Sequence, residues 1–186
     1  MRGVVTALLL CSLSSALPVQ AQRADSIIER RSAAYRQLRS LTAEFDQVIS
    51  NEMIGTYKSR GALAQAGAAR LSMRFTEPAG EAIVIDGTSI WVYTPTTAPG
   101  QVLRAPIARA AGYGANPPAW PPDKPAERYK VTLLRGDTVA GTPVDVLRLM
   151  PAVEGLPFTS ATLWLARSDG LPRRLEVTEP SGNRRT

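Results

Sequence analysis

A change in hydrophobic period near residue 40 constrains this chain more than any other feature. Residues 24–39 carry apolar side chains at helical spacing, namely Ile27, Ile28, Ala34, Tyr35 and Leu38. Beyond them apolar and polar residues alternate, as in 41–49 and 71–75. Alternation of this kind is typical of antiparallel strands that bury one face and expose the other. The chain therefore predicts a mainly β fold preceded by one amphipathic helix.

Turn signals divide the remainder into short strands. The expected strands are 81–85, 88–93, 101–105, 128–135, 138–149, 162–167 and 171–178. They are expected to turn at Asp86-Gly87, Gly136-Asp137 and Asp169-Gly170. About nine antiparallel strands with no internal repeat predict one domain built on a strongly curved sheet or partly open barrel. A parallel nucleotide-binding fold is disfavoured, because helices do not alternate with strands and no glycine-rich phosphate loop is present.

The N-terminus has the pattern of a cleavable signal peptide. A positively charged start precedes an apolar run, and Val19 and Ala21 are the small residues that signal peptidase requires. A membrane anchor is disfavoured because the apolar stretch is shorter than the roughly 20 residues that span a bilayer. A lipoprotein signal at Cys11 is disfavoured because a leucine precedes that cysteine. We expect cleavage after Ala21, secretion, and a mature domain of residues 22–186.

The scarcity of histidine and cysteine excludes several classes of catalytic and metal-binding site. The chain has no histidine and one cysteine, so neither a Ser-His-Asp site nor the usual zinc site can be built. An enzyme would depend on carboxylates such as Asp137, Asp145 or Glu154, but each stands near a turn, where acidic residues are ordinary. The surplus of arginine over lysine could indicate nucleic acid or anionic lipid. Because arginines are spread through all elements, we expect a solvated surface and a binding protein without metal or cofactor.

Residues 106–125 show neither the helical spacing nor the two-residue alternation of strands. The segment contains Pro117-Pro118 and Pro121-Pro122, together with Tyr113 and Trp120. Proline removes backbone donors and fixes φ, so this segment is not expected to form a central strand or a long helix. It is either a solvated loop or a lid whose aromatic side chains find cover.

Read together, the strands resemble a known family. The segments that carry the resemblance are 41–47, 61–63, 73–78, 83–87, 90–95, 163–165 and 169–177. In this order, behind a signal peptide, they are similar to the periplasmic outer-membrane lipoprotein carrier family of the LolA type, over about 26–186. The resemblance implies a half-open barrel with helices across its mouth and an apolar cavity. It also implies a monomeric periplasmic shuttle that takes acylated lipoproteins from an inner-membrane lipoprotein-releasing transporter to an outer-membrane acceptor.

The apolar face of the strands supplies candidates for such a cavity. Methionine and phenylalanine form an adaptable lining for flexible chains, although the same side chains could simply fill a barrel core. The candidate cavity residues are Leu38, Phe45, Leu71, Met73, Phe75, Ile83, Ile85, Trp91 and Tyr93. The candidate lid residues are Ile27, Tyr35, Tyr113 and Trp120. A second reading of the same scaffold is a periplasmic domain that stores or senses another lipophilic ligand.

Two features depart from the family pattern. Members commonly have an arginine before a proline that ties the lid to the barrel, and that position falls on Gly67 here. Arg60, Arg70 or Arg74 could take its place. After 171–178 and a turn, only residues 184–186 begin a return strand. We expect a shortened chain that lacks at least one C-terminal strand and leaves a sheet edge unpaired.

Overall fold

The computed structural model describes residues 17–53, 55–67, 69–107, 125–156 and 158–186. Two helices are present among them, α1 (Leu17–Arg36) and α2 (Pro125–Arg128). The strands of the first part are β1 (Ser40–Asn51), β2 (Gly55–Ala66), β3 (Arg70–Glu77), β4 (Ala82–Ile85), β5 (Ser89–Tyr93) and β6 (Val102–Pro106). Those of the second part are β7 (Tyr129–Val139), β8 (Thr142–Pro151), β9 (Ser160–Ala166), β10 (Pro172–Thr178) and β11 (Arg184–Arg185).

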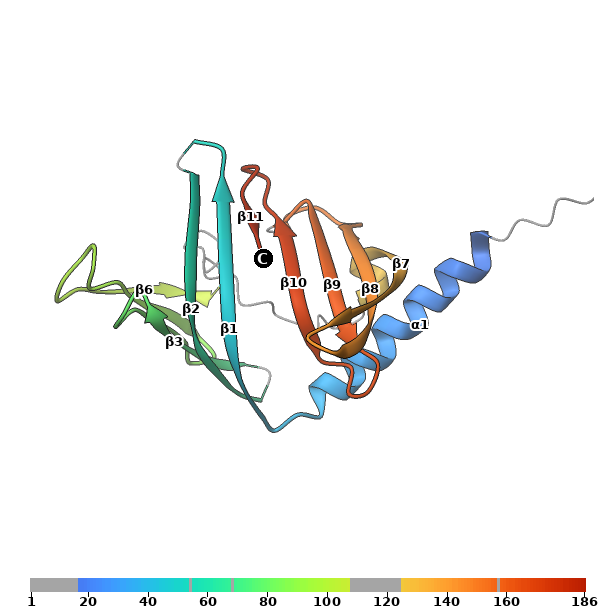
Figure 1. Cartoon of the computed structure of the whole chain (residues 1–186), viewed down its shortest axis with the longest axis horizontal. Helices are drawn as coiled ribbons and strands as arrows, with labels where there is room; N and C mark the ends of the chain where they lie inside the picture. Colours follow the sequence, from blue (N-terminus) through green and yellow to red (C-terminus); the bar gives the residue numbers. More distant parts are fainter. Residues whose placement is uncertain (1–16, 54, 68, 108–124, 157) are drawn as a thin grey trace, which may run out of the picture.

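All eleven strands form one antiparallel sheet in the order β6-β5-β4-β3-β2-β1-β11-β10-β9-β8-β7. Two meanders, β1–β6 and β7–β10, are thus brought into one sheet by the short strand β11, which lies between β1 and β10 (Figure 1). The sheet curves and does not close, since β6 and β7 lie at its opposite edges. This architecture confirms the predicted mainly β, half-open fold.

Helix α1 packs on the second meander. Its buried apolar side chains among the described residues are Ala24, Ile27, Ile28 and Tyr35, which recur at three- and four-residue intervals or their sums. They share one core cluster with Leu147, Leu163 and other residues of β7–β9. Burying an isoleucine of this kind contributes roughly 1.5–3 kcal/mol. The helix begins earlier and ends three residues sooner than the predicted 24–39, and the predicted cleavage point after Ala21 lies within it.

Register places α1 and the apolar side chains of the first meander on the same face of the sheet. Across the junction Ile49 is opposite Arg185, which is opposite Val177. Val177 in turn belongs to the cluster that packs under α1. Directly paired residues share a face, so this concave face carries the odd-numbered residues of β1, including Phe45 and Ile49. We call the opposite side the outer face.

The β7–β8 hairpin turns at a different point from the predicted one. Strand β7 continues through Gly136 and Asp137, and the turn is formed by Ala140 and Gly141, both with positive φ. Glycine at 136 serves another purpose, because a Cβ there would lie 2.5 Å from Nη2 of Arg167. The expected Gly136-Asp137 turn is therefore wrong, whereas the hairpins at Asp86-Gly87 and Asp169-Gly170 are confirmed.

Two strands exceed the count of nine, β2 and β11. Strand β2 is rich in glycine and alanine, so its alternation is faint, yet it pairs with β1 along its whole length. Strand β11 pairs β10 at Val177 and Thr178. Among the described residues, no strand neighbours 172–176 on that side. Strand β10 is therefore paired on both sides at its end, by β9 and β11, and the shortened chain stays a prediction.

A cleft between the two meanders

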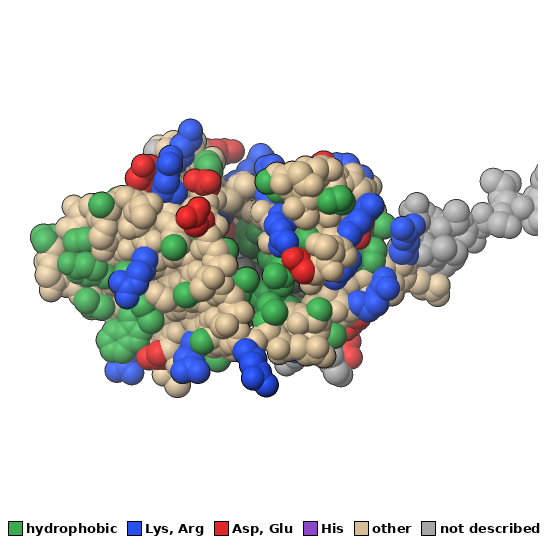
Figure 2. All heavy atoms as spheres, turned by 60° about the horizontal axis from the view of Figure 1, so that its bottom comes forward, with side chains coloured by type: hydrophobic (Ala, Val, Ile, Leu, Met, Phe, Trp, Pro, Cys, Tyr) green, Lys and Arg blue, Asp and Glu red, His purple; other side chains and the backbone are tan. Residues whose placement is uncertain are grey.

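A large hollow lies where β1 and β10 diverge below β11. It has a volume of about 900 Å³, and Figure 2 shows hydrophobic side chains inside a depression between the two parts of the sheet. One wall is formed by β1–β4 and the other by β10 and the residues before it, with Tyr35 of α1 and Arg185 of β11 at the ends. The cleft is therefore built by segments that are distant in sequence.

Most of the lining is apolar. Strand alternation places Phe45, Leu71, Met73 and Ile83 on the concave face, and all four line the cleft. The opposite wall adds Leu171, Leu175 and Val177, and the first wall also adds Leu41 and Leu63. These side chains are half-buried rather than enclosed. The arrangement can hold a flexible apolar ligand while leaving part of it exposed.

An aromatic pair spans a glycine in the middle of the first wall. Gly61 of β2 lies between Phe45 of β1 and Phe75 of β3 in the register of the sheet. The two rings meet edge to face with centroids 5.3 Å apart, a favourable arrangement for aromatic side chains. Gly61 leaves the room for this contact, so Phe75 supports Phe45 from behind without lining the cleft itself.

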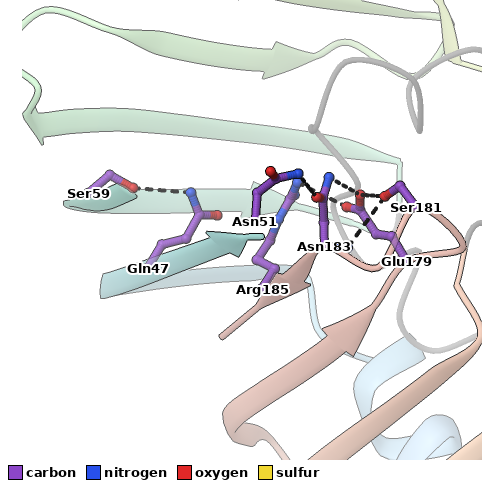
Figure 3. Close-up of polar contacts among 7 residues, drawn as sticks. All are labelled: Gln47, Asn51, Ser59, Glu179, Ser181, Asn183 and Arg185. Carbon is purple, nitrogen blue, oxygen red and sulfur yellow. Dashed lines mark hydrogen bonds and ion pairs between the residues drawn. The ribbon is translucent and has the colours of Figure 1, made fainter. Parts of the chain in front are cut away.

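The end of the cleft beside β11 is polar (Figure 3). Arg185 points to the concave face, and its Nη2 lies 3.4 Å from Oε1 of Glu179. Burial lowers the pKa of the Arg185 guanidinium, and the charge of Glu179 opposes that shift. Glu179 also accepts hydrogen bonds from Asn183 at 3.2 Å and Ser181 at 3.4 Å. This end can therefore contact the polar part of an amphipathic ligand.

Two more contacts complete the polar end. Nδ2 of Asn51 donates to Oδ1 of Asn183, which connects the β1–β2 hairpin to the turn before β11. Nε2 of Gln47 donates to Oγ of Ser59 at 3.1 Å across β1 and β2. Gln47 lines the cleft, so the polar surface extends from β11 onto the first wall.

A side-chain hydrogen bond bridges the other end. The Tyr35 hydroxyl donates a hydrogen bond to Oε1 of Gln65. Gln65 is opposite Leu41 on β1, whereas Ser59 is opposite Gln47. Leu41 and Gln47 are six residues apart along β1, which corresponds to about 20 Å. The cleft thus runs from a tyrosine–glutamine contact to an arginine–glutamate pair, with an apolar stretch between them.

The structure brings only some of the predicted cavity residues together. Phe45, Leu71, Met73 and Ile83 line the cleft. Ile85 shares their face but is buried in the small cluster with Ile90. Leu38 packs against the core under α1. The sheet register decides which of these side chains share a face. The strand 171–178 was predicted from the sequence, but the place of Leu171, Leu175 and Val177 in the opposite wall was not.

Trp91 and Tyr93, which were also predicted to line the cavity, do not lie on the concave face. Ile85 is opposite Ile90 and Ile83 is opposite Val92, so Trp91 and Tyr93 point to the outer face. There the Trp91 indole donates to Oδ2 of Asp86 at 2.8 Å, and the Arg104 guanidinium lies 4.8 Å from its ring centroid. The expectation that these two aromatics line the cavity is therefore wrong, and even-numbered Ile90 and Val92 face inward instead.

The predicted lid residues are divided in the same way. Tyr35 reaches the cleft, but Ile27 is 6 % exposed and belongs to the core beneath α1. Moving the whole helix would expose Ile27 and Ile28, so α1 is a fixed layer rather than a lid, and only its last turn borders the cleft. Tyr113 and Trp120 lie outside the described residues.

None of the suggested substitutes for the family arginine faces the cleft. Gly67 lies in the β2–β3 turn with φ +61°, and its N–H donates to the Arg39 carbonyl at 2.9 Å. Arg60 contacts Glu77 at 3.2 Å on the outer face, and Arg70 and Arg74 share that face by alternation along β3. An arginine tie between lid and sheet is therefore not formed by these residues.

The candidate catalytic carboxylates do not form a pair. Asp137 is opposite Val144 on β8, so Asp137 and Asp145 point to opposite faces of the hairpin. Asp137 contacts Arg135 at 3.2 Å and Asp145 contacts Arg167 at 2.8 Å, while Glu154 is exposed. Hydrogen bonds, first from the Thr138 N–H and then from Trp164, lower the pKa of the Asp137 carboxyl.

Two other kinds of site are missing from the described residues. No three or more acidic, cysteine or histidine side chains within the described ranges gather as metal ligands would. Neither described helix has the length and apolar content to cross a bilayer.

Comparison with known proteins finds one matching family model and several solved structures of similar fold. The family model described as outer membrane lipoprotein carrier protein LolA matches residues 36–186. The solved structure of MucB is similar with a TM-score of 0.55 and 20% identity, covering 89% of this chain and 57% of MucB. MucB in the Pseudomonas aeruginosa MucA/MucB complex gives a TM-score of 0.51 at 20% identity, with 88% and 55% covered.

An uncharacterized conserved protein from Thermus thermophilus gives a TM-score of 0.50 at 14% identity, over 89% of this chain and 83% of that one. At these identities the likeness concerns the fold alone. A comparison with curated protein sequences finds no match.

Proposed function

Because this chain belongs to the LolA family of outer membrane lipoprotein carriers, we propose that it carries lipoprotein acyl chains in the cleft between β1 and β10. The carriage would run through the periplasm, from an inner-membrane lipoprotein-releasing transporter to an outer-membrane acceptor. The observation that supports this most directly is the apolar lining of the 900 Å³ cleft on the concave face. Its members Phe45, Leu71, Met73 and Ile83 come from three strands whose alternation turns the same face inward.

The openness of the cleft suits a carrier that must release its cargo. Burying an acyl chain yields roughly 0.8 kcal/mol per CH₂, so about sixteen carbons would yield on the order of 12 kcal/mol if fully enclosed. Several chains held in that way would not leave on a useful timescale. Half-buried walls reduce this energy, and the polar end at Arg185 and Glu179 accommodates the less apolar linkage of the cargo.

A second candidate is a periplasmic domain that senses or stores another lipophilic ligand. The fold likeness to MucB, whose structure in complex with MucA is known, favours keeping this candidate. Both candidates use the same cleft, so they differ in the ligand rather than in the site.

Mass spectrometry of protein purified from the periplasm separates the two. Triacylated lipoprotein in the complex supports the carrier, whereas free fatty acid or isoprenoid alone supports the sensor. Leu71→Glu places a charge in the apolar wall and should abolish loading. Ser72→Glu, the next residue on the outer face, is the matched control and should load normally. Normal loading of folded Leu71→Glu would contradict the proposed site.

A further inference from the structure

Strands β4–β6 carry an apolar patch on the outer face of the sheet. Val84 lies opposite Trp91 in one row, and Tyr93 lies opposite Val102 in the next. Val84 is 37 % exposed and Val102 is 58 % exposed, while the two aromatic side chains are half-buried. Both described helices pack on the second meander, so neither covers this patch. Figure 2 shows hydrophobic side chains gathered at this end of the molecule.

Arginines border the patch on both sides. Arg104 of β6 lies opposite Trp91, and Arg74 of β3 lies opposite Ala82, the residue that pairs with Tyr93. Within the described part of the chain, Arg74 takes part in no ion pair, and its side chain is exposed. An exposed apolar surface next to cationic side chains is typical of a docking site.

Trp91 is held in place from its edge and from its face. Its indole donates a hydrogen bond to Oδ2 of Asp86 at 2.8 Å, and the Arg104 guanidinium lies 4.8 Å from its ring centroid. Nε of Arg104 in turn donates to Oγ of Ser89 at 3.1 Å. The other carboxylate oxygen of Asp86 accepts bonds from the Thr88 and Ser89 amides, so its charge is satisfied within the turn. A side chain that is already fixed loses little conformational freedom when it binds a partner.

The second meander contains the same arrangement in a buried form. The Arg174 guanidinium lies 4.7 Å from the ring centroid of Trp164, whose indole contacts Asp137 at 3.4 Å. Trp164 is only 6 % exposed, because it packs with Val144 and Val146. A tryptophan held by arginine and aspartate can therefore be covered on this sheet, and the first meander leaves it uncovered.

The composition of the patch fits the surface of a lipid bilayer. Tryptophan and tyrosine have an apolar body and a polar tip, and they favour the boundary between acyl chains and water. Arginine binds phosphate groups well. A single-stranded nucleic acid would stack its bases on an open aromatic face, whereas Arg104 occupies one face of Trp91. We propose that the outer face of β4–β6 docks on the anionic phospholipid surface of a membrane, with Arg74 and Arg104 on the phosphates.

The other charges of the outer face confine this contact to one end of the sheet. The acidic side chains of the first meander on that face lie on β1 and at the end of β3, and they include Asp46 and Glu77, which contact Arg60. An anionic surface would repel them, so β4–β6 turns toward the bilayer and β1 away from it. The apolar cleft opens on the concave face instead. Docking is therefore separate from lipid carriage and does not depend on it.

Flotation with lipid vesicles tests this surface. The probe vesicles contain equal parts of phosphatidylcholine and phosphatidylglycerol, and vesicles of phosphatidylcholine alone serve for comparison. We expect at least tenfold tighter binding to the anionic vesicles, because each arginine near such a surface strengthens binding about fivefold. Val102→Glu and Arg74→Glu should each weaken this binding at least tenfold.

Met150→Glu and Arg148→Glu are the matched controls. Both residues are exposed on β8, on the outer face of the second meander, and the changes in charge are the same. Their binding should stay within threefold of that of the unchanged protein. Equal losses in the patch and control variants would show that overall charge attracts the vesicles, and this would overturn the proposal, as would equal binding to both kinds of vesicle.

Bromolipid quenching of tryptophan fluorescence locates the contact. A protein with Trp120→Phe and Trp164→Phe keeps Trp91 alone, and anionic vesicles with brominated acyl chains should quench its emission strongly. A protein that keeps Trp164 alone should be quenched at most half as much. Vesicle-bound protein with an unquenched Trp91 would contradict the proposal. Adding Leu71→Glu, which should abolish loading of the cleft, should leave the quenching of Trp91 unchanged, so docking and lipid carriage can fail independently.

Discussion

The Tyr35 hydroxyl donates a hydrogen bond to Oε1 of Gln65, and this contact joins α1 to β2 across the mouth of the cleft. Helix α1 is otherwise packed on the second meander. The contact therefore ties the two meanders at the end opposite β11. Gln65 stands two residues before Gly67, the position at which the family resemblance leads one to expect an arginine, and Gly67 itself lies in the β2–β3 turn.

A double-mutant cycle on this contact should show coupling. Tyr35→Phe removes the donor and leaves Oε1 of Gln65 partly buried without that partner, so we expect a loss of about 1 kcal/mol in the free energy of unfolding. Gln65→Leu should cost a similar amount, and the double variant less than the sum. Urea unfolding of the four proteins measures this. Strictly additive losses would show that the contact does not join α1 to β2 energetically.

Local pattern was enough to predict the concave face of β1, β3 and β4, because each has a clean alternation that a one-residue slip would invert. It failed at Trp91 and Tyr93, which were expected in the cavity but lie on the outer face. The Ile85–Ile90 pair, on either side of the turn, sets the face of β5 and turns Trp91 outward.

The second wall of the cleft could not be predicted in the same way. Leu175 and Phe45 line the same cleft because the sheet places β10 and β1 on either side of β11. The local sequence of neither strand indicates which strand lies across the cleft from it. Likewise Gly136 carries the signature of a turn, but its missing Cβ makes room for Arg167, a residue 31 positions away along the chain. Non-local packing decides such positions.

Gly61→Ala should destabilise the first meander. A Cβ at this position would lie 2.1 Å from the carbonyl oxygen of Arg74, so β2 or β3 must shift and the Phe45–Phe75 contact would open. We expect a loss of at least about 2 kcal/mol, measured by urea unfolding. Ala62→Ser is the control, because Ala62 is the next residue of β2 and its side chain lies on the outer face of the sheet. It should change the free energy of unfolding by less than about 0.5 kcal/mol. A tolerated Gly61→Ala would show that the two strands are not held this closely.

The Asp86 carboxyl should make stability fall in acid. A hydrogen bond from the Trp91 indole, followed by bonds from the Ser89 and Thr88 amides, lowers the pKa of Asp86 below its ordinary value of 3.8. As pH falls, Asp86 is therefore protonated in the unfolded chain before it is protonated in the folded protein. Its contribution to the stability of the folded protein is complete above about pH 4 and is lost as pH falls toward the folded pKa. Trp91→Phe should raise the pKa of Asp86 and flatten the acid side of the stability curve.

NMR titration of the Asp86 carboxyl carbon measures this shift. Trp164→Phe makes the same change in the second meander, where the indole contacts Asp137 at 3.4 Å, and should leave the pKa of Asp86 unchanged. An unaltered pKa of Asp86 in Trp91→Phe would show that the backbone amides alone hold it low.

Glu179→Gln should loosen the junction between the two meanders. The variant keeps the size of the side chain but removes the charge that opposes the desolvation of Arg185. It also weakens the acceptor for Asn183 and Ser181. We expect a loss of about 2 kcal/mol, as for hydrogen bonds to buried charged groups, and faster amide exchange at Val177 and Thr186. Glu176→Gln is the matched control, because its pair with Arg174 is exposed on the outer face and surface pairs contribute about 0.5 kcal/mol. Equal losses in the two variants would mean that the polar end does not hold β11 in place between β1 and β10.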